Sequence, residues 1–250
     1  MTNVFISIVN HGHEKLIFNN SELLKVAKLP NVRVILKDNV KNEELKIFSQ
    51  SNGLDYLVSD QVLGFGDNNN FVFNYCLSQG MSSADWFLVV NPDVIITELE
   101  FNKLTNLLNV TKGKLLTINL YKDDEYLISE NSLRYYPSFL SVINLLLNKP
   151  VTKMYDKESL LTNSQVEWAS GAFLIFKTEH FENLGGFDRR YFMYYEDVDI
   201  CFRSNSSFGE MVTYIKDVRA LHDGAYQNRN IFSRHFYWYL ASLFKFIKGK

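Results

Sequence analysis

Residues 166–208 read VEWASGAFLIFKTEHFENLGGFDRRYFMYYEDVDICFRSNSSF, and the rest of the chain is organised around this stretch. An apolar run at 172–176 is followed by a dense group of aromatic residues and then by Glu196, Asp197 and Asp199. Burial beside aromatic rings raises the pKa of a carboxyl group, so that its carboxylate becomes a usable base. Acids also favour the first turn of a helix. We expect both features: a short helix over 196–203 whose amino end presents the acids to a cleft.

The chain before this stretch alternates between short apolar runs and segments with an apolar helical face. Nearly continuous apolar runs are typical of strands that are buried on both faces of a sheet. Strands that alternate with helices predict an α/β fold, in which helices flank a mostly parallel, doubly wound sheet. The expected strands are 4–9, 32–36, 54–58 and 86–90, and the expected helices are 14–29, 43–50 and 71–77.

The middle of the chain is less regular. We expect a helix at 101–108 and a strand at 114–120, and residues 166–176 should return the chain to the sheet. No linker, internal repeat or low-complexity segment is evident, which favours a single domain over residues 1–250.

Composition argues against several classes of protein. The chain has 250 residues and a net charge of −2, whereas a general nucleic-acid binder carries a basic excess. The first residues lack the basic start and long apolar stretch of a signal peptide, and no apolar run reaches the ~18 residues of a spanning helix. Cys76 and Cys201 lie far apart without metal-ligand spacing, which fits a reducing compartment. We therefore expect a cytoplasmic protein that is soluble or attached to a membrane surface without crossing it.

Polar residues suited to ligand binding follow the ends of the expected strands. His11, Asp38 and Asp93 each follow such a strand, and Gly64 and Gly66 follow another. In doubly wound sheets, ligands bind beyond the carboxyl ends of the strands. The shared placement of these residues therefore predicts a ligand site at one edge of the sheet.

Three short motifs each have a functional and a structural interpretation. Asp93, in Asn91-Pro92-Asp93, can hold a divalent cation against phosphates, or it can cap the following helix. His222 would complete such a site if it lay near Asp93, although a single histidine is more often structural. Gly64-Phe65-Gly66 with Asn68 lets a ligand approach the backbone closely, but it is neither a P-loop nor a full dinucleotide fingerprint, and an ordinary turn with a helix cap also fits.

The carboxyl-terminal segment 224–250 contains basic residues but no acid. A basic, aromatic amphipathic helix of this kind suits an anionic membrane surface. A terminal helix that packs on the domain and leaves a solvated basic face fits the pattern equally well. On a helical projection, the apolar stripe consists of Phe232, Phe236, Leu240, Leu243 and Ile247, opposite Arg234, Trp238, Lys245 and Lys248.

Together these stretches resemble the family 2 glycosyltransferases, which have the GT-A fold, over nearly the whole chain. The most specific part is WASGAFLIFKTEHFENLGGFDRRYFMYYEDVDICFR at 168–203, which is similar to the family's acceptor-side and catalytic segment. SIVNHGHE near the start, GFGDNNN, NPD and LHDG are most similar to bacterial rhamnosyltransferases of O-antigen assembly. The resemblance implies an inverting, metal-dependent transfer of L-rhamnose from dTDP-β-L-rhamnose to N-acetylglucosaminyl-diphospho-polyprenol, with an α-linked product, by a peripheral enzyme on the inner face of the cell membrane.

The resemblance also divides the chain by role. Residues 1–120 would bind the nucleotide sugar, and 121–223 would bind the acceptor and carry out catalysis. Within the second part, the apolar and aromatic character of 135–147 itself predicts a flap or helix that lines the acceptor site. Residues 224–250 would form the basic amphipathic helix.

Each candidate residue receives a role from the same resemblance. Asp197 matches the catalytic base, with Glu196 and Asp199 in support: one orients the acceptor and the other pairs with Arg203. Asp93 and His222 match the ligands of a Mg²⁺ or Mn²⁺ ion, although Asn91 replaces the first aspartate of the family's Asp-x-Asp motif, which weakens the site. The residues expected to bind the acceptor are Trp168, Ser170, Gly171 and Tyr195. The residues expected to contact the donor are Val9, Asn10, His11, Asp38, Gly64, Gly66, Asn68 and Asn91.

Three other functions stay open on the sequence. A transferase of the same fold would use another nucleotide sugar, such as a UDP-hexose. A non-catalytic sugar- or ion-binding module would use the acids at 196–199 as ligands, although they lack the glycine and closing glutamate of an EF-hand. A hydrolase of nucleotide sugars would release free sugar. The transferase interpretation requires that Asp197 faces Asp93 and His222 across one cleft.

Overall fold

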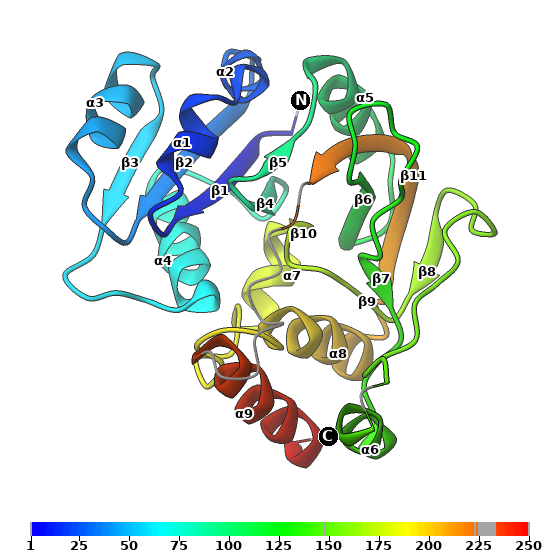
Figure 1. The fold of residues 1–250 in the computed structure, drawn as a ribbon. Helices are drawn as coiled ribbons and strands as arrows, with labels where there is room; N and C mark the ends of the chain where they lie inside the picture. The colour runs from blue at the N-terminus through cyan, green and yellow to red at the C-terminus, as the bar shows by residue number, and fades with distance from the viewer. Residues whose placement is uncertain (1, 148, 223, 225–233, 250) are drawn as a thin grey trace.

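The computed structural model describes residues 2–147, 149–222, 224 and 234–249. At its centre is a nine-stranded sheet with the strand order β3-β2-β1-β4-β10-β6-β11-β5, in which β8 also pairs with β11 (Figure 1). β7 and β9 form a separate two-stranded sheet. The strands are β1 (Val4–Asn10), β2 (Val32–Asp38), β3 (Asp55–Val58), β4 (Trp86–Val90), β5 (Val94–Ile95), β6 (Leu115–Tyr121), β7 (Leu133–Arg134), β8 (Ser164–Val166), β9 (Trp168–Ala169), β10 (Phe173–Lys177) and β11 (Val212–His222).

The first half of the sheet is parallel, as the βαβ pattern predicts. β2 and β4 flank β1 in parallel register, with Val4 opposite Val32 on one side and Trp86 on the other. β10 then runs antiparallel between β4 and β6, and the long β11 pairs with β6 in parallel. The α/β, doubly wound architecture is confirmed, and the apolar run at 172–176 does return the chain to the sheet, but in the antiparallel direction.

The helices that the sequence predicts are present, with differences in extent. The expected helix 14–29 is divided, because the side chain of Asn20 caps α2 by accepting a hydrogen bond from Leu23 N at 3.0 Å. The helix expected at 71–77 starts earlier, because α4 already begins at Phe65 with Gly64 as its N-cap. The helices expected at 101–108 and 196–203 extend over 98–108 and 196–208. The helices are α1 (Glu14–Phe18), α2 (Ser21–Val26), α3 (Glu43–Ser51), α4 (Phe65–Ser78), α5 (Glu98–Leu108), α6 (Phe139–Leu146), α7 (Thr178–Asn183), α8 (Glu196–Phe208) and α9 (Arg234–Gly249).

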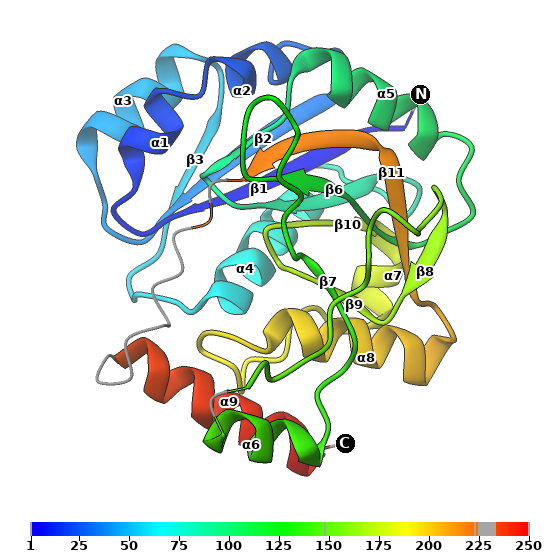
Figure 2. The ribbon, with the colours of Figure 1, turned by 45° about the vertical axis from the view of Figure 1, so that its right-hand side comes forward.

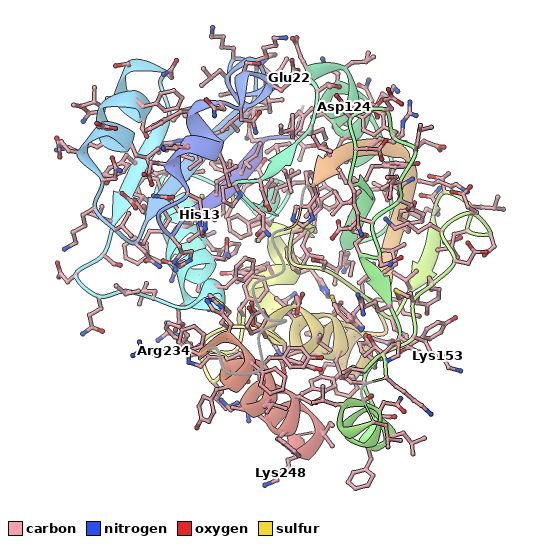
Figure 3. All side chains as sticks on the ribbon, in the orientation of Figure 1. His13, Glu22, Asp124, Lys153, Arg234 and Lys248 are labelled. Carbon is pink, nitrogen blue, oxygen red and sulfur yellow. The ribbon has the colours of Figure 1, made fainter. Side chains whose placement is uncertain are left out.

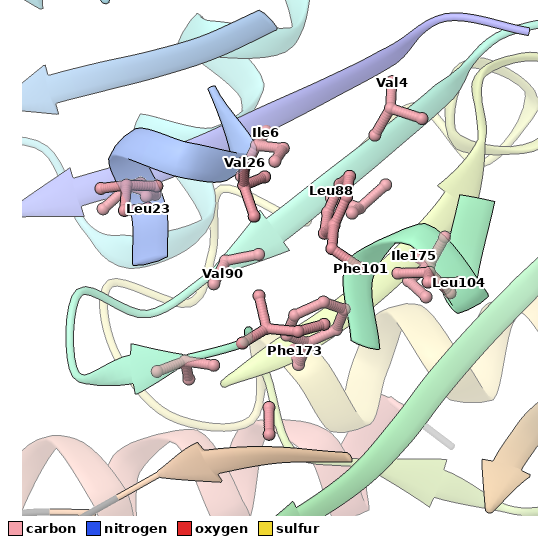
Figure 4. Packing of buried hydrophobic residues seen from close by; sticks show 14 of the residues in the cluster. Val4, Ile6, Leu23, Val26, Leu88, Val90, Phe101, Leu104, Phe173 and Ile175 are labelled. Carbon is pink, nitrogen blue, oxygen red and sulfur yellow. The ribbon is translucent and has the colours of Figure 1, made fainter. Parts of the chain in front are cut away.

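Each face of the sheet has its own hydrophobic core. On one face, α2 and α5 pack against the strands through residues such as Val26 and Phe101 (Figure 4). On the other face, Phe73 of α4, Phe181 of α7 and Cys201 of α8 are buried against the strands. Full burial of one such aliphatic or aromatic side chain contributes roughly 1.5–3 kcal/mol. The two cores therefore fix the positions of the strand ends, where the candidate site residues lie.

α9 packs beneath the sheet domain, beside α8 and α6 (Figure 2). Its most buried apolar residues are Leu243 and Phe246, which contact Tyr191 and Tyr195. The expected apolar stripe is therefore only partly correct: Leu243 is buried, Phe236, Leu240 and Ile247 are half-buried, and Phe232 lies outside the described residues. In the described part of the chain, no helix has the combination of length and apolarity needed to cross a membrane.

Candidate active site

Asp197 lies at the amino end of α8, where backbone N–H groups hold its carboxylate. Its Oδ2 accepts a hydrogen bond from Gly171 N at 3.0 Å, and its Oδ1 accepts one from Val198 N at 2.8 Å. Burial raises the pKa of Asp197, and these hydrogen bonds and the charge of Arg134 only partly oppose the rise. The side chain keeps some contact with solvent. Asp197 is thus a fixed carboxylate of raised basicity, which is what a general base requires.

Glu196 is the more deeply buried member of the acidic pair. Glu196 is only 6% exposed to solvent. In the described part of the chain, its Oε2 atom has no hydrogen-bond partner. Burial, and secondly the charge of Asp197, raise the pKa of Glu196 well above its ordinary value. Neighbouring carboxyl groups disfavour double ionisation. We infer that Glu196 keeps the proton, so that Asp197, with its two N–H donors, is the ionised partner.

The helix that carries these acids starts from a strained backbone. Tyr194 and Tyr195 have φ angles of 67° and 69°, in the left-handed region that bulky residues rarely adopt. Such a residue costs about 1–3 kcal/mol and persists only where its surroundings fix it. Here the Tyr195 hydroxyl donates to the Tyr239 hydroxyl at 3.2 Å, and the Tyr194 hydroxyl lies 3.0 Å from Nδ1 of His235. α9 therefore helps to hold the acids in place.

Of the residues expected to bind the acceptor, Gly171 bonds Asp197 and Tyr195 precedes it by two positions in the chain. Ser170 N donates to Ser132 O at 2.9 Å, and Trp168 Nε1 donates to Tyr135 O at 2.9 Å. A Cβ atom on Gly171 would lie 3.5 Å from the Cβ of Asp197 and 3.2 Å from the ring of Phe65. Of the two supporting acids, one of which was expected to pair with Arg203, it is Asp199 that does so, with Arg203 Nε donating to Asp199 Oδ2 at 2.7 Å.

Asp93 and His222 meet, although they lie far apart in the sequence. The Nε2 atom of His222 is 3.4 Å from Oδ1 of Asp93, and its Nδ1 is 2.8 Å from Oε2 of the buried Glu130. Burial alone would lower the pKa of His222, but its bonds to Asp93 and Glu130 outweigh burial and raise the pKa to about 9. The same histidine lowers the pKa of Asp93, although burial works the other way.

This arrangement fits a divalent metal ion. Carboxylate oxygen suits Mg²⁺ and Mn²⁺, and the imidazole of His222 can join an ion only after Nε2 has lost its proton, which the positive charge of the ion favours; two ligands of one ion can be 3.4 Å apart. A metal-binding histidine usually donates its other N–H to a carboxylate, as His222 can to Glu130. Within the described residues, however, no group of three or more His, Cys, Asp or Glu side chains can hold a metal. The protein itself therefore offers a partial site that suits an ion already bound to phosphate oxygens.

Asp38 has a structural role at the end of β2. It is fully buried, and its carboxylate accepts hydrogen bonds from Asn10 Nδ2, Val40 N, Asn42 N and the Tyr56 hydroxyl, at 3.0, 2.9, 2.6 and 2.8 Å. A carboxylate has about four lone-pair positions. Because these four donors already occupy the lone-pair positions, Asp38 can contact a nucleotide base only after losing one of the four hydrogen bonds.

His11 offers a free donor in the same region. Asn39 Nδ2 lies 2.9 Å from His11 Nδ1 and also donates to Leu63 O at 2.9 Å, so His11 Nδ1 must be the acceptor. The proton then sits on Nε2, which is buried and has no partner in the described part of the chain. Burial, followed by the charges of His13 and Lys37, lowers the pKa of His11 to about 4. His11 is therefore a neutral donor that can bond a carbonyl oxygen of a ligand.

Gly64 and Gly66 contact the second half of the chain. A Cβ atom on Gly64 would lie 2.1 Å from Phe192 O, and one on Gly66 would lie 2.7 Å from the Cβ of Phe187. Asn68 donates to the carbonyls of Leu63 and Gly64 at 2.9 and 2.8 Å. These residues thus let the segment that leads to Glu196 and Asp197 pack closely on α4. Val9 is buried in β1.

Backbone hydrogen bonds connect the segment that carries Asp93 to Asp197. Asn91 N donates to Ala172 O at 2.9 Å, and the neighbouring Gly171 bonds Asp197. Asn91 precedes Asp93 by two residues, and β5, which follows Asp93, pairs with β11 so that Val94 lies opposite His222. The structure therefore brings Asp93, His222, Gly171 and Asp197 to one edge of the sheet.

Sequence reasoning missed several residues of this site. Glu130 and Arg134 lie in the irregular segment 121–165, which has no periodic pattern to mark them. Tyr239 lies on α9, and its contact with Tyr195 spans 44 positions. Only the fold brings these side chains to the acids and to His222.

The sequence is similar to known rhamnosyltransferases. It is 32% identical over 250 residues to rhamnosyltransferase WbbL of Escherichia coli (strain K12), a match that covers 99% of this chain and 93% of that protein. It is 30% identical over 149 residues to N-acetylglucosaminyl-diphospho-decaprenol L-rhamnosyltransferase of Mycobacterium tuberculosis, covering 57% of this chain and 48% of that protein. No protein-family model matches the chain.

Solved structures with the same fold are GT-A glycosyltransferases. The mannosyltransferase PcManGT of Pyrobaculum calidifontis, in complex with GDP-Man and Mn²⁺, superimposes with a TM-score of 0.65 at 12% identity, covering 99% of this chain and 64% of that one. GalNAc-T7, with UDP, GalNAc and Mn²⁺, superimposes with a TM-score of 0.60 at 11% identity, covering 89% and 44%. At these identities the likeness concerns the fold alone, and it confirms the GT-A architecture.

Proposed function

The chain belongs to the family 2 glycosyltransferases of GT-A fold, in the group that includes rhamnosyltransferase WbbL, and from this membership we propose that it transfers L-rhamnose from dTDP-β-L-rhamnose to N-acetylglucosaminyl-diphospho-polyprenol. The product would be an α-linked rhamnosyl lipid for O-antigen or another cell-surface polysaccharide. The observation that supports the proposal is that the Asp93–His222 contact and the bond from Gly171 N to Asp197 lie at the same edge of the sheet, where Asn91 N donates to Ala172 O.

In the proposed reaction, Asp197 takes the proton from the acceptor hydroxyl. That hydroxyl oxygen attacks the anomeric carbon as the bond to the nucleotide diphosphate breaks, which inverts a β-linked donor to an α-linked product. Glu196, which keeps its proton, avoids a second negative charge beside Asp197 and would orient the acceptor. Trp168, Ser170, Gly171 and Tyr195 would form the wall against which the acceptor sugar is held.

Asp93 and His222 would bind the diphosphate end of the donor through Mg²⁺ or Mn²⁺. The ion supplies positive charge that stabilises the departing diphosphate. Glu130 supports this arrangement, since its carboxylate orients the His222 ring and leaves Nε2 directed toward Asp93. Asn91 takes the place of a second carboxylate, so the protein's own share of the coordination is small.

The nucleoside end of the donor would lie near the ends of β1 and β2. The Nε2–H of His11 would donate to a carbonyl oxygen of the thymine base, because a buried donor without a partner favours a ligand that supplies an acceptor. Val9 and Asn10 would line the same pocket. Asp38, Gly64, Gly66 and Asn68 would contribute by shaping this pocket through their protein contacts.

The proposed acceptor is a lipid, so the enzyme would work at the inner face of the cell membrane as a peripheral protein. α9 and its basic residues support this placement, since Arg234 and Lys248 are exposed on a helix without acids.

One assay tests the function directly. The protein with Mn²⁺ is incubated with dTDP-L-rhamnose, UDP-glucose or GDP-mannose and a short-chain N-acetylglucosaminyl-diphospho-lipid, and the products are identified by mass. We expect the acceptor to gain one rhamnosyl residue, and only with the dTDP donor. Gain of a hexose would assign another nucleotide sugar, free rhamnose would indicate a hydrolase, and donor binding without any product would indicate a non-catalytic module.

A further inference from the structure

α6 and α9 lie side by side, although about ninety residues separate them in the sequence (Figures 1 and 2). Leu145 of α6 packs against the cluster that contains Leu243 and Phe246 of α9. The two helices thus form one continuous surface at the end of the molecule opposite α2 and α3 (Figure 1).

Large apolar side chains point outward from this surface. On α6 and just after it, Phe139, Leu140 and Leu147 are 72%, 64% and 59% exposed. On α9, Tyr237 and Phe244 are 71% and 46% exposed, and their spacing of seven residues puts them on one face of the helix. Single exposed apolar residues are common on proteins, but a group of them on adjoining helices marks an interaction surface.

The charge of the surface favours an anionic partner. Residues 131–155 contain Arg134, Lys149 and Lys153 and no acid, and residues 234–249 contain Arg234, Lys245 and Lys248 and no acid. Lys153, Arg234 and Lys248 are exposed around these helices (Figure 3). Exposed aromatic and aliphatic side chains surrounded by cations suit the interface of an anionic bilayer.

The surface also adjoins the catalytic carboxylate. The Tyr239 hydroxyl of α9 bonds Tyr195, the residue before Glu196 and Asp197. A diphosphate lipid whose tail stays in the bilayer would therefore meet Asp197 close to the membrane.

We propose that α6 and α9 together form a docking surface for anionic membranes, in which α6 inserts its apolar residues beside α9. This rests on the proposed function only for the nature of the acceptor. α6 is then a membrane-contact element, which differs from a flap that closes over the acceptor sugar.

The test is binding of the full chain to vesicles of phosphatidylcholine alone or with phosphatidylglycerol, measured by co-sedimentation. We expect tight, salt-sensitive binding to the anionic vesicles. Leu140→Ser and Phe244→Ser should each weaken it roughly five- to tenfold, as expected for losing the insertion of one large side chain. Leu99→Ser is the matched control, since Leu99 is 67% exposed on α5, away from this surface.

Circular dichroism and thermal unfolding establish that each variant is folded. Unchanged vesicle binding by folded Leu140→Ser would overturn the proposal, as would equal weakening by Leu99→Ser. Self-association of the wild type that Leu140→Ser abolishes, measured by sedimentation velocity, would assign the surface to a second copy and also overturn it.

Transfer assays separate this proposal from the proposed function. Leu140→Ser should keep wild-type turnover with a water-soluble, short-chain acceptor and lose turnover with an acceptor embedded in anionic vesicles. If the wild type transfers rhamnose to neither acceptor yet binds the vesicles as described, the proposed function fails and the docking surface stands.

Discussion

Glu130 is the residue through which the protein orients His222, and it makes a direct prediction. In Glu130→Gln the carboxylate that receives the His222 Nδ1–H is lost, and loss of such a partner weakens metal binding about 10–100-fold. Titration of Mn²⁺ in the presence of dTDP, followed by electron paramagnetic resonance, measures the affinity without any turnover. Glu125→Gln, at an exposed acid of the same segment, is the control and should bind Mn²⁺ like the wild type. Equal affinities in all three proteins would show that Glu130 does not support a metal site.

His11 makes a prediction for the pH dependence of stability. Burial is the main reason why the pKa of His11 falls to about 4 in the folded chain, below its ordinary value of 6.5. The unfolded chain therefore binds a proton at His11 before the folded chain does, so His11 favours unfolding as the pH falls from 6.5 towards 4. Urea unfolding at pH 7 and pH 5 should show a smaller loss of stability for His11→Gln than for the wild type. The same loss in both proteins would contradict the neutral, buried imidazole on which the base contact depends.

The amino end of α4 shows how an element can serve the site without touching a ligand. Gly64 lets Phe192 O approach its backbone, and Phe65 N donates to that oxygen at 3.1 Å. Gly64→Ala would put a methyl group 2.1 Å from Phe192 O and push away the segment that precedes Glu196. We expect a loss of about 1–3 kcal/mol in the free energy of unfolding, as for other overpacked sites, together with reduced turnover.

Chemical denaturation measures this effect, and Gly249→Ala provides the matched control. Apart from its chain neighbours and its own helix backbone, no atom of the described residues would lie within 4 Å of a Cβ at position 249, so this variant should be as stable as the wild type. A Gly64→Ala protein of wild-type stability would mean that the 191–195 segment can move away from α4 without loss.

Helices and strands were predictable where a single physical effect, such as burial or helix capping, determines their sequence pattern. β1 and β4 are buried on both faces, so their apolar runs mark them clearly, and α8 begins at Glu196 where its acids predict a helix start. The sequence predicts a helix only from residue 71, because the glycine and asparagine of 65–70 have low helix propensity. Its helix persists because tertiary contacts replace propensity: Asn69 accepts from Ser7 at 2.7 Å, and Asn70 donates to Phe187 O at 2.8 Å. The apolar run of β10 indicates a buried strand, but it does not indicate that the strand is antiparallel.

At the scale of the whole molecule, the candidate site is assembled from contacts between distant segments. The expected partners Asp93 and His222 do meet, and Gly171 does reach Asp197. The sequence marks such residues individually, since each follows a strand or starts a helix. It could not mark Glu130, whose bond to His222 spans 92 positions, nor the contact between α6 and α9, because these depend on how the irregular segment 121–165 crosses the sheet.

The central claim is that the first half of the chain binds the nucleotide diphosphate, while the second half supplies the proton acceptor to the same cleft. The most direct measurement is the turnover of Asp197→Asn with dTDP-L-rhamnose and the lipid-linked acceptor, beside its affinity for dTDP with Mn²⁺. Asparagine nearly preserves the shape of the side chain but cannot take the proton, so we expect unchanged dTDP affinity and turnover lower by about 10²–10⁴-fold. Near-wild-type turnover in this variant would contradict the claim.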